Sequence, residues 1–213
     1  MITRLRRRLE CLAGRCTIMH GLLAFVVGRW NTLMEFTETS IKGAFLISMN
    51  RIEDDRGFFA RGWCRDEFSK HGLIGEMVQL NVGFSHSKGT LRGLHYQRSP
   101  HQEAKLVRCT RGAIFDVVVD CRIDSPTHRQ WFGAELSAAN GTMLYAPEGC
   151  AHGYQTLMDD TETYYLTSNY YAAASATGVR YDDRAFEIRW PIPVTVISRA
   201  DREWPDYPAD SNR

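Results

Sequence analysis

A chain of 213 residues is long enough to bury a core, and its length fits one domain or one domain with an appendage. Its 26 basic and 25 acidic residues leave a formal net charge of +1, which gives no global indication of a nucleic-acid partner or an anionic membrane surface. The longest apolar run, HGLLAFVVG, is shorter than the ~20 residues that cross a bilayer. We therefore expect no nucleic-acid binding and no membrane association.

The N-terminal segment 1–33 differs from the rest of the chain. Six arginines against the single acidic residue Glu10 give this segment a net charge of +5, which leaves −4 for the remainder. A basic start before a short apolar run is typical of a signal peptide, but no clear small-residue cleavage site follows. We predict that residues 1–33 form a basic extension outside the fold and that residues 34–213 form one domain.

Six cysteines are spread along the chain without a CxxC pair. Most of them lie among apolar neighbours in strand-like segments. Such cysteines are more typical of buried, reduced thiols in a cytoplasmic protein than of a disulfide framework or a zinc site. We therefore expect a cytoplasmic protein.

From residue 41 onwards, short segments rich in β-branched and aromatic residues alternate with Gly, Pro, Asn and Asp, which predicts many short strands. Helical periodicity is weak, and only RDEFSKHGL (65–73) predicts a helix. Many strands without intervening helices indicate an antiparallel sandwich or barrel of the jelly-roll type. KLVRC and AIFDVVVDC predict a hairpin with Gly112 in its turn. The predicted strands are IKGAFLISM, MVQLNVGFS, KLVRC, AIFDVVVDCR, QWFGAEL, TMLYAP, GYQTLM and TETYYLTSNYY.

Two stretches combine glycine and histidine in a pattern that resembles the paired motifs of the cupin superfamily. GTLRGLHYQ places His95 six residues after Gly89, and GTMLYAPEGCAH follows the pattern G-x5-P-x-G-x2-H and ends at His152. Metal-binding cupins continue the first motif as HxH, whereas this chain has Gln97 in the second position. A metal ion needs about three or four converging ligands, and each motif offers one histidine, so we expect no metal. No Gly-rich dinucleotide-binding loop follows a predicted strand, so we expect no redox cofactor either.

A longer series of motifs follows in order over residues 34–206. They are DDRGFFAR, QLN, GTLRGLHYQ, EAKLVRCTRGAIFDVVVD, SPT, LYAPEGCAHGYQTL, ETYYLTSNYY, RYDD, IRWP and ISRADREWPD. This series resembles the dTDP-4-dehydrorhamnose 3,5-epimerase family of metal-free cupins. The resemblance implies an all-β, cupin-type jelly-roll barrel with few short helices. It also implies a homodimer that exchanges N-terminal strands, for which 41–50 is the predicted segment.

The activity that the resemblance implies is an isomerase reaction in dTDP-rhamnose or related deoxysugar biosynthesis. It inverts C3 and C5, the carbons that flank the ketone of a nucleotide-linked 4-keto-6-deoxy sugar such as dTDP-4-dehydro-6-deoxyglucose. Such inversion needs a base on one face, an acid on the other and a group that stabilises the enolate oxygen. By resemblance, the catalytic residues are His95 as base, Asp201 as its partner, Lys105 near the sugar carbonyl and Tyr165 as acid.

Substrate-binding residues follow from the same resemblance. By resemblance, Arg92 corresponds to the pyrophosphate-binding arginine of the family. A guanidinium also matches phosphate oxygens well. In a regular strand Arg92 and His95 would face opposite sides, so Gly93 between them predicts a bulge or bend that lets both serve one pocket. The further binding candidates are Arg56, Gln79, Asn81 and His152.

Two departures from the family pattern bear on the substrate. Arg61 stands where the family often has an acidic residue, and QLNVGFS replaces a tighter Q-x-N-x-S. They leave open the exact nucleotide sugar and whether one or both carbons are inverted. The alternatives are a single-carbon epimerase acting at C3 or C5 of a related nucleotide sugar, a non-catalytic cupin that binds a nucleotide sugar, and a metal-dependent cupin, which Gln97 opposes.

Overall fold

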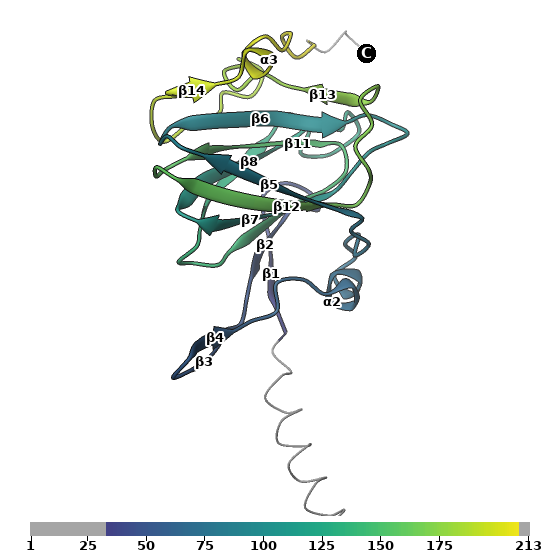
Figure 1. Ribbon diagram of the computed structural model, residues 1–213. Coiled ribbons are helices and arrows are strands. Elements are labelled where there is room, and N and C mark those ends of the chain that lie inside the picture. The colour runs from purple at the N-terminus through teal and green to yellow at the C-terminus, as the bar shows by residue number, and fades with distance from the viewer. Residues whose placement is uncertain (1–32, 209–213) are drawn as a thin grey trace, which may run out of the picture. The chain divides into compact units, whose positions relative to one another are not determined.

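The computed structural model describes residues 33–208 (Figure 1). The predicted extension therefore lies, except for Leu33, outside the described residues. Of these, residues 34–49 and 62–208 belong to one compact unit, and Leu33 and residues 50–61 belong to another. No helix in the described part of the chain is long and apolar enough to cross a membrane.

The larger unit is built from two sheets, each with six strands among the described residues. Every strand pair in these sheets is antiparallel except β14–β6, which confirms the predicted all-β class and jelly-roll type of fold. The first sheet has the order β1 (Glu35–Glu38), β2 (Phe45–Ser48), β10 (Met143–Ala146), β7 (Lys105–Arg111), β12 (Thr161–Thr167) and β5 (Gln79–Ser85). The second has the order β13 (Ala176–Gly178), β6 (Thr90–Gln97), β11 (Cys150–Thr156), β8 (Ala113–Asp120) and β9 (Trp131–Ser137), and β14 (Val196–Ile197) pairs with β6.

The main core contains buried side chains from both sheets. Val107 of β7 packs in the same cluster as Ile114 and Val118 of β8. Because successive side chains of a strand point to opposite faces, Leu106 belongs instead to a second cluster with Phe68 of α2 (Arg65–Lys70). The predicted helix is thus confirmed, and its buried phenylalanine covers the outer face of the first sheet.

The predicted hairpin between KLVRC and AIFDVVVDC is wrong. β7 pairs with β10 and β12 in the first sheet, whereas β8 pairs with β9 and β11 in the second. Gly112 does supply a turn, with φ of +76°, but the chain crosses there from one sheet to the other. Both strands are apolar and largely buried. Their local sequence pattern is therefore the same whether the turn between them closes a hairpin or crosses from one sheet to the other.

The segment 41–50 contains β2, which pairs with β1 and β10 of the same chain. β1 precedes the first strand that the sequence pattern predicts. The exchange of this segment across a dimer stays a prediction.

The smaller unit contains the hairpin of β3 (Ile52–Asp54) and β4 (Gly57–Phe59). Arg56 lies in its turn, where the guanidinium is 2.6 Å from the Asp54 carboxylate and 89% of the side chain is exposed. Within the same unit, the guanidinium of Arg51 lies 4.5 Å from the centre of the Phe58 ring.

Candidate active site

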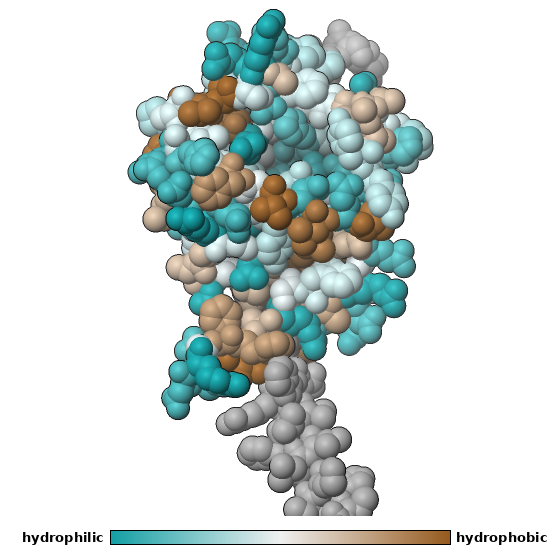
Figure 2. Space-filling model, in the orientation of Figure 1, coloured by the Kyte–Doolittle hydropathy of each residue, from teal (hydrophilic) through white to brown (hydrophobic). Residues whose placement is uncertain are grey.

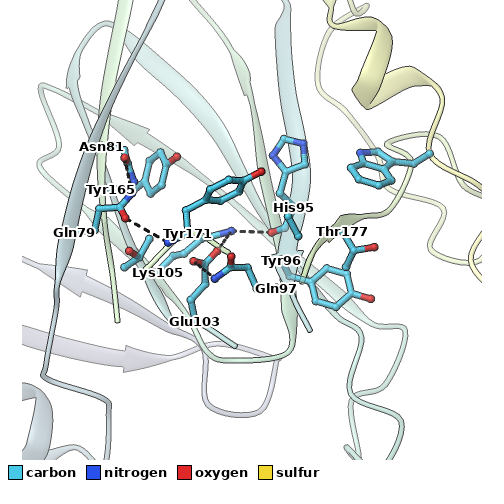
Figure 3. Close-up of a pocket in the computed structure, with 13 residues that line it drawn as sticks. Gln79, Asn81, His95, Tyr96, Gln97, Glu103, Lys105, Tyr165, Tyr171 and Thr177 are labelled. Carbon is cyan, nitrogen blue, oxygen red and sulfur yellow. Dashed lines mark hydrogen bonds and ion pairs between the residues drawn. The ribbon is translucent and has the colours of Figure 1, made fainter. Parts of the chain in front are cut away.

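A cavity of about 510 Å³ is lined by side chains from both sheets (Figure 3). Strand register explains how one wall forms. Asn81 of β5 lies opposite Tyr165 of β12, and in the next row Gln79 lies opposite Thr167, which lies opposite Lys105 of β7. The remaining lining residues are His95, Tyr96, Gln97, Glu103, Tyr171, Ala176, Thr177 and Trp204. The cavity thus brings together five of the predicted site residues, namely His95, Lys105, Tyr165, Gln79 and Asn81.

The predicted base and its carboxylate partner are in direct contact. His95 Nε2 lies 2.5 Å from Asp201 Oδ1. Asp201 is in α3 (Arg199–Arg202), a short helix whose N-cap Ser198 accepts a hydrogen bond from the Asp201 N–H at 3.0 Å. The Asp201 side chain is 9% exposed, whereas that of His95 is 47% exposed and faces the cavity.

The Asp201 carboxyl is held in its ionised form. Burial alone would raise its pKa, but the hydrogen bond and charge of His95, together with the Gly93 N–H at 3.3 Å, keep the pKa of Asp201 below its usual value. An ionised carboxylate only accepts hydrogen bonds, so it fixes His95 as the tautomer that donates from Nε2. Nδ1 is then the nitrogen that can take a proton from a substrate.

The predicted irregularity in the strand of His95 is present. Between Arg92, opposite Tyr154, and His95, opposite His152, β6 advances three residues while β11 advances two. Both Arg92 and His95 are exposed, as the bulge requires. Gly93 has φ of +114°, and a Cβ atom there would lie 2.6 Å from the Gly153 Cα, so only glycine fits.

Arg92 lies beside the cavity rather than in its lining. Its Nε donates to the Ser85 hydroxyl at 3.0 Å, and its guanidinium donates to the Phe84 carbonyl at 2.8 Å. The positive charge of Arg92 acts on Tyr165, whose pKa it tends to lower. A role in binding pyrophosphate stays a prediction, and so does substrate binding by Arg56, which lies in the smaller unit.

Lys105 points between the sheets, on the same face of β7 as the core residue Val107. Its ammonium donates to the His95 carbonyl at 2.8 Å and lies 3.1 Å from Glu103 Oε1. Burial lowers the pKa of Lys105, and the adjacent Glu103 carboxylate opposes that effect. A cation at this position lies next to the backbone of the base, where it can face a developing negative charge.

Tyr165 keeps its proton under ordinary conditions. Burial first, and then the negative charge of Glu103, raise the pKa of the Tyr165 phenol. Two amide side chains line the cavity on the same sheet: Gln79 Nε2 donates to Asn81 Oδ1 at 2.9 Å. The wall therefore offers a neutral acid and amide groups that can hydrogen-bond to a sugar.

His152 is buried and does not line the cavity. Its Nε2 lies 2.7 Å from Asp116 Oδ1, and the Asp116 side chain is fully buried. Burial raises the pKa of Asp116, while the charge and hydrogen bond of His152 act against that effect. The structure gives His152 a carboxylate partner, and its predicted contact with substrate is untested.

Several cavity residues were not among the predicted site residues, above all Glu103, Tyr171 and Trp204. The ring of Trp204 meets the His95 ring edge to face, with centroids 6.2 Å apart. The motifs EAKL, TSNYY and REWPD contain these residues, but nothing in a local pattern indicates that they meet. Within residues 33–208 there is no group of three or more His, Cys, Asp or Glu side chains arranged to hold a metal ion.

The arrangement combines the parts that proton transfer next to a ketone requires. A carboxylate-oriented imidazole faces a sugar-sized cavity, a protonated phenol lines the same cavity, and an ammonium lies between them in the wall. Such a site can remove a proton, stabilise the oxygen of an enolate and return a proton.

Comparison with known proteins agrees with this chemistry. The family model of dTDP-4-dehydrorhamnose 3,5-epimerase matches residues 38–208. The dTDP-4-dehydrorhamnose 3,5-epimerase of Sinorhizobium fredii is 43% identical over 173 residues, which are 81% of this chain and 89% of that protein. The crystal structure of a dTDP-4-dehydrorhamnose 3,5-epimerase from Bacillus anthracis with TDP and PPi bound is 39% identical, with a TM-score of 0.79, and the match covers 82% of this chain and 100% of that one.

A related enzyme of different outcome is also similar. The structure of a 3′-monoepimerase from Streptomyces bikiniensis in complex with dTDP-quinovose is 35% identical, with a TM-score of 0.73, and the match covers 79% of this chain and 85% of that one. The family match spans both sheets and every predicted catalytic position. The chain therefore belongs to the dTDP-4-dehydrorhamnose 3,5-epimerase family.

Proposed function

We propose that this protein catalyses cofactor-independent epimerisation of a nucleotide-linked 4-keto-6-deoxy sugar, inverting dTDP-4-dehydro-6-deoxyglucose at C3 and C5 in dTDP-rhamnose or related deoxysugar biosynthesis. The observation that supports it best is the His95–Asp201 pair, 2.5 Å apart, facing a cavity that Lys105 and Tyr165 also line. A non-catalytic binding protein would not need this pair, because nothing in nucleotide-sugar binding requires a histidine oriented by an ionised carboxylate.

In the proposed mechanism His95 Nδ1 takes the proton from the carbon next to the ketone. The resulting imidazolium is stabilised by Asp201, which stays ionised. The electron pair of the broken C–H bond moves to the ketone oxygen, where the Lys105 ammonium offsets the developing negative charge. Tyr165 then donates its proton to the opposite face of the same carbon, and this inverts the configuration.

Recognition of the nucleotide is proposed for residues around the cavity. Arg92 suits the pyrophosphate because it is an exposed cation across the bulge of β6 from His95. Gln79 and Asn81 suit hydroxyl or carbonyl groups of the sugar or base. Arg56 and His152 are proposed as further binding residues.

A second candidate function is the inversion of C3 alone or C5 alone. It is favoured by the similarity to the 3′-monoepimerase, which is 35% identical to this chain. The same base and acid serve either outcome, so the two candidate functions differ in which carbons of the sugar approach His95.

One experiment separates these functions. Purified protein is incubated with dTDP-4-keto-6-deoxyglucose in deuterated water that contains a chelator, and deuterium at C3 and C5 is followed by NMR. We expect deuterium at both carbons and an epimerised product. Deuterium at one carbon supports the single-carbon epimerase, and deuterium at neither contradicts the proposed activity. Loss of activity that only a divalent ion restores would contradict cofactor independence.

We also propose a homodimer in the cytoplasm. β5 is an edge strand of its sheet, and its outward side chains Leu80, Val82 and Phe84, together with Val78 just before the strand, are 37–64% exposed. Figure 2 shows apolar side chains on the face where β5 runs in Figure 1. Exposed apolar edges favour pairing with another chain. Sedimentation that gives a monomer at micromolar concentration would contradict the dimer.

The described cysteines are free thiols, which suits the proposed location in the cytoplasm, a reducing compartment.

A further inference from the structure

Glu103 and Lys105 form a buried ion pair in the wall of the cavity (Figure 3). Glu103 Oε1 lies 3.1 Å from Lys105 Nζ, and the two side chains are 10% and 8% exposed, respectively. The proposed mechanism uses the ammonium but assigns nothing to the carboxylate. A buried charge is costly unless it is paired, so the Glu103 carboxylate favours the charged form of Lys105.

The direction of the Glu103 carboxylate is fixed by Gln97. Gln97 Nε2 donates to Glu103 Oε2 at 3.0 Å. The Gln97 amide also contacts three backbone positions: its Nε2 lies 2.8 Å from the His101 carbonyl and 3.1 Å from the Tyr170 carbonyl, so its two hydrogens are shared among three acceptors, and its Oε1 accepts from the Ala172 N–H at 2.6 Å. One carboxylate oxygen is thus held by the amide and the other is left for the lysine.

The ammonium of Lys105 is also fixed in direction. It donates to the His95 carbonyl at 2.8 Å, so it is held between the backbone of the proposed base and Glu103. An ammonium has three donors, and the third is free to meet a ketone oxygen in the cavity.

The charge of this ammonium depends on its neighbours. Burial lowers the pKa of Lys105, whereas the charge and hydrogen bond of Glu103 and, less strongly, the charge of Asp116 raise it. The other titratable side chains that line the same cavity are His95, Tyr96, Tyr165 and Tyr171, and His152 is bound to Asp116. Glu103 is the carboxylate in contact with the ammonium, so it opposes the loss of the lysine proton most directly.

We infer that Glu103 is a positioning residue for Lys105, which keeps the ammonium charged and directed at the ketone oxygen of the substrate. This inference rests on the proposed function. This role differs from that of a base. If Glu103 were the base, its replacement would abolish exchange at every pH, whereas the loss of a positioning charge changes the pH range in which Lys105 is a cation.

The test uses Glu103→Gln, which keeps the shape and removes the charge, and Glu103→Asp, which keeps the charge on a shorter side chain. Glu135→Gln is the matched control, because Glu135 is exposed on β9 and does not line the cavity. For each protein, kcat and kcat/KM with dTDP-4-keto-6-deoxyglucose are measured across pH. We expect the alkaline limb of kcat/KM to move to lower pH in Glu103→Gln, to stay near its wild-type position in Glu103→Asp with a lower kcat, and to be unchanged in Glu135→Gln.

A double-mutant comparison guards against a merely structural effect. Once Lys105→Met has removed the ammonium, adding Glu103→Gln should change kcat by much less than it does in the wild-type background. An unshifted alkaline limb in a folded Glu103→Gln protein, or equal effects of the substitution in both backgrounds, would overturn the inference. Complete loss of deuterium exchange at every pH in Glu103→Gln would also overturn it, in favour of Glu103 as a base.

If Glu103→Gln does not fold, Gln97→Met replaces it, because this change frees the carboxylate without removing its charge. A lower kcat with an unshifted alkaline limb then supports positioning, and an unchanged kcat overturns it. Wild-type protein without exchange or epimerisation would instead contradict the proposed function, so the two failures are distinguishable.

Discussion

His95 Nε2 lies 2.5 Å from Asp201 Oδ1, although 106 positions separate the two residues in the chain. The contact depends on a bulge in β6 and on the capped start of α3, which bring Gly93, His95 and Asp201 together. Because Asp201 is ionised and occupies Nε2, the reactive nitrogen of His95 is Nδ1. The geometry therefore gives the two residues different roles: His95 removes the proton, and Asp201 orients His95.

Replacing these two residues should have unequal effects. His95→Ala should abolish both deuterium exchange and epimerisation, because His95 is the one histidine among the residues that line the described cavity. General bases commonly contribute ~10²–10⁴-fold to the rate. Asp201→Asn should weaken catalysis less completely, because the imidazole remains but loses its fixed tautomer and its stabilising charge. Exchange is measured by NMR and product by chromatography, and full exchange in His95→Ala would exclude His95 as the base.

Tyr165→Phe should separate exchange from inversion. The phenol is proposed to donate a proton to the far face, so its loss should reduce product formation by about 10²-fold or more. Some exchange should persist, because His95 can return a solvent-derived proton to its own face. The neighbouring Tyr164→Phe is the control, since Tyr164 is not in the cavity lining. Equal loss of exchange and inversion in Tyr165→Phe would contradict this division of labour.

The strands were predictable from the sequence, but their assignment to sheets was not. Runs of β-branched and other apolar residues mark β7 and β8 well, because each strand pattern is local. Whether the turn at Gly112 closes a hairpin or crosses between sheets depends on which distant strands pair with β7 and β8. Those pairings with β10, β12, β9 and β11 span long sequence separations and leave no local signal.

The site shows the same limit. A histidine, a lysine, a tyrosine and an aspartate far apart in the chain gave no reason, one by one, to share a pocket, and only the ordered family motifs grouped them. Glu103 was missed because a carboxylate two residues from a lysine is usually solvated, and its burial arises from the loop that Gln97 anchors. The bulge at Gly93 was predictable, because Arg92 and His95 could share a pocket only if the strand was irregular.

Gly93→Ala should damage both the fold and the site. A Cβ atom at this position would lie 2.6 Å from the Gly153 Cα and 2.8 Å from the His152 carbonyl oxygen, and neither is the end of a flexible side chain. We expect the free energy of unfolding to fall by roughly 2–4 kcal/mol, from overpacking and backbone strain together, and epimerase activity to fall with it.

Gly72→Ala is the matched control for this change. Gly72 has φ of +71° but nothing within 4 Å of its Cβ position. An alanine there therefore costs only the strain of a left-handed backbone, about 1–2 kcal/mol. Urea unfolding followed by tryptophan fluorescence measures both variants. If Gly93→Ala costs no more than Gly72→Ala, close packing of β6 against β11 is not what requires glycine.

The last prediction concerns acid stability and Asp120, a fully buried carboxylate at the end of β8. Burial alone would raise its pKa, but hydrogen bonds from Arg122, Ser125 and Thr127 outweigh that effect and lower the pKa of Asp120 to about 2. The Arg122 guanidinium donates at 2.7 Å and the Thr127 hydroxyl at 2.6 Å. The carboxylate therefore organises the loop that follows β8.

The direction of the pH dependence follows from this lowered pKa. The unfolded chain binds a proton at Asp120 near pH 3.8, whereas the folded chain does so only near pH 2. The stabilisation by Asp120 is thus fully present above about pH 4 and is lost as the pH falls towards 2; the shift corresponds to roughly 2 kcal/mol. Asp120→Asn should lower the free energy of unfolding at neutral pH and bring the two proteins closer together at low pH.

Urea unfolding of wild type and Asp120→Asn between pH 2 and 7 measures this difference, and Asp124→Asn, exposed in the same loop, is the control. Other carboxyl groups also titrate in acid, but they do so in both proteins, so the difference between the two curves isolates Asp120. A difference that stays constant from pH 7 to pH 2 would mean that the asparagine disturbs packing alone. A difference that shrinks below pH 4 in Asp120→Asn, with none in Asp124→Asn, is expected because the donors of Arg122, Ser125 and Thr127 stabilise the charged carboxylate.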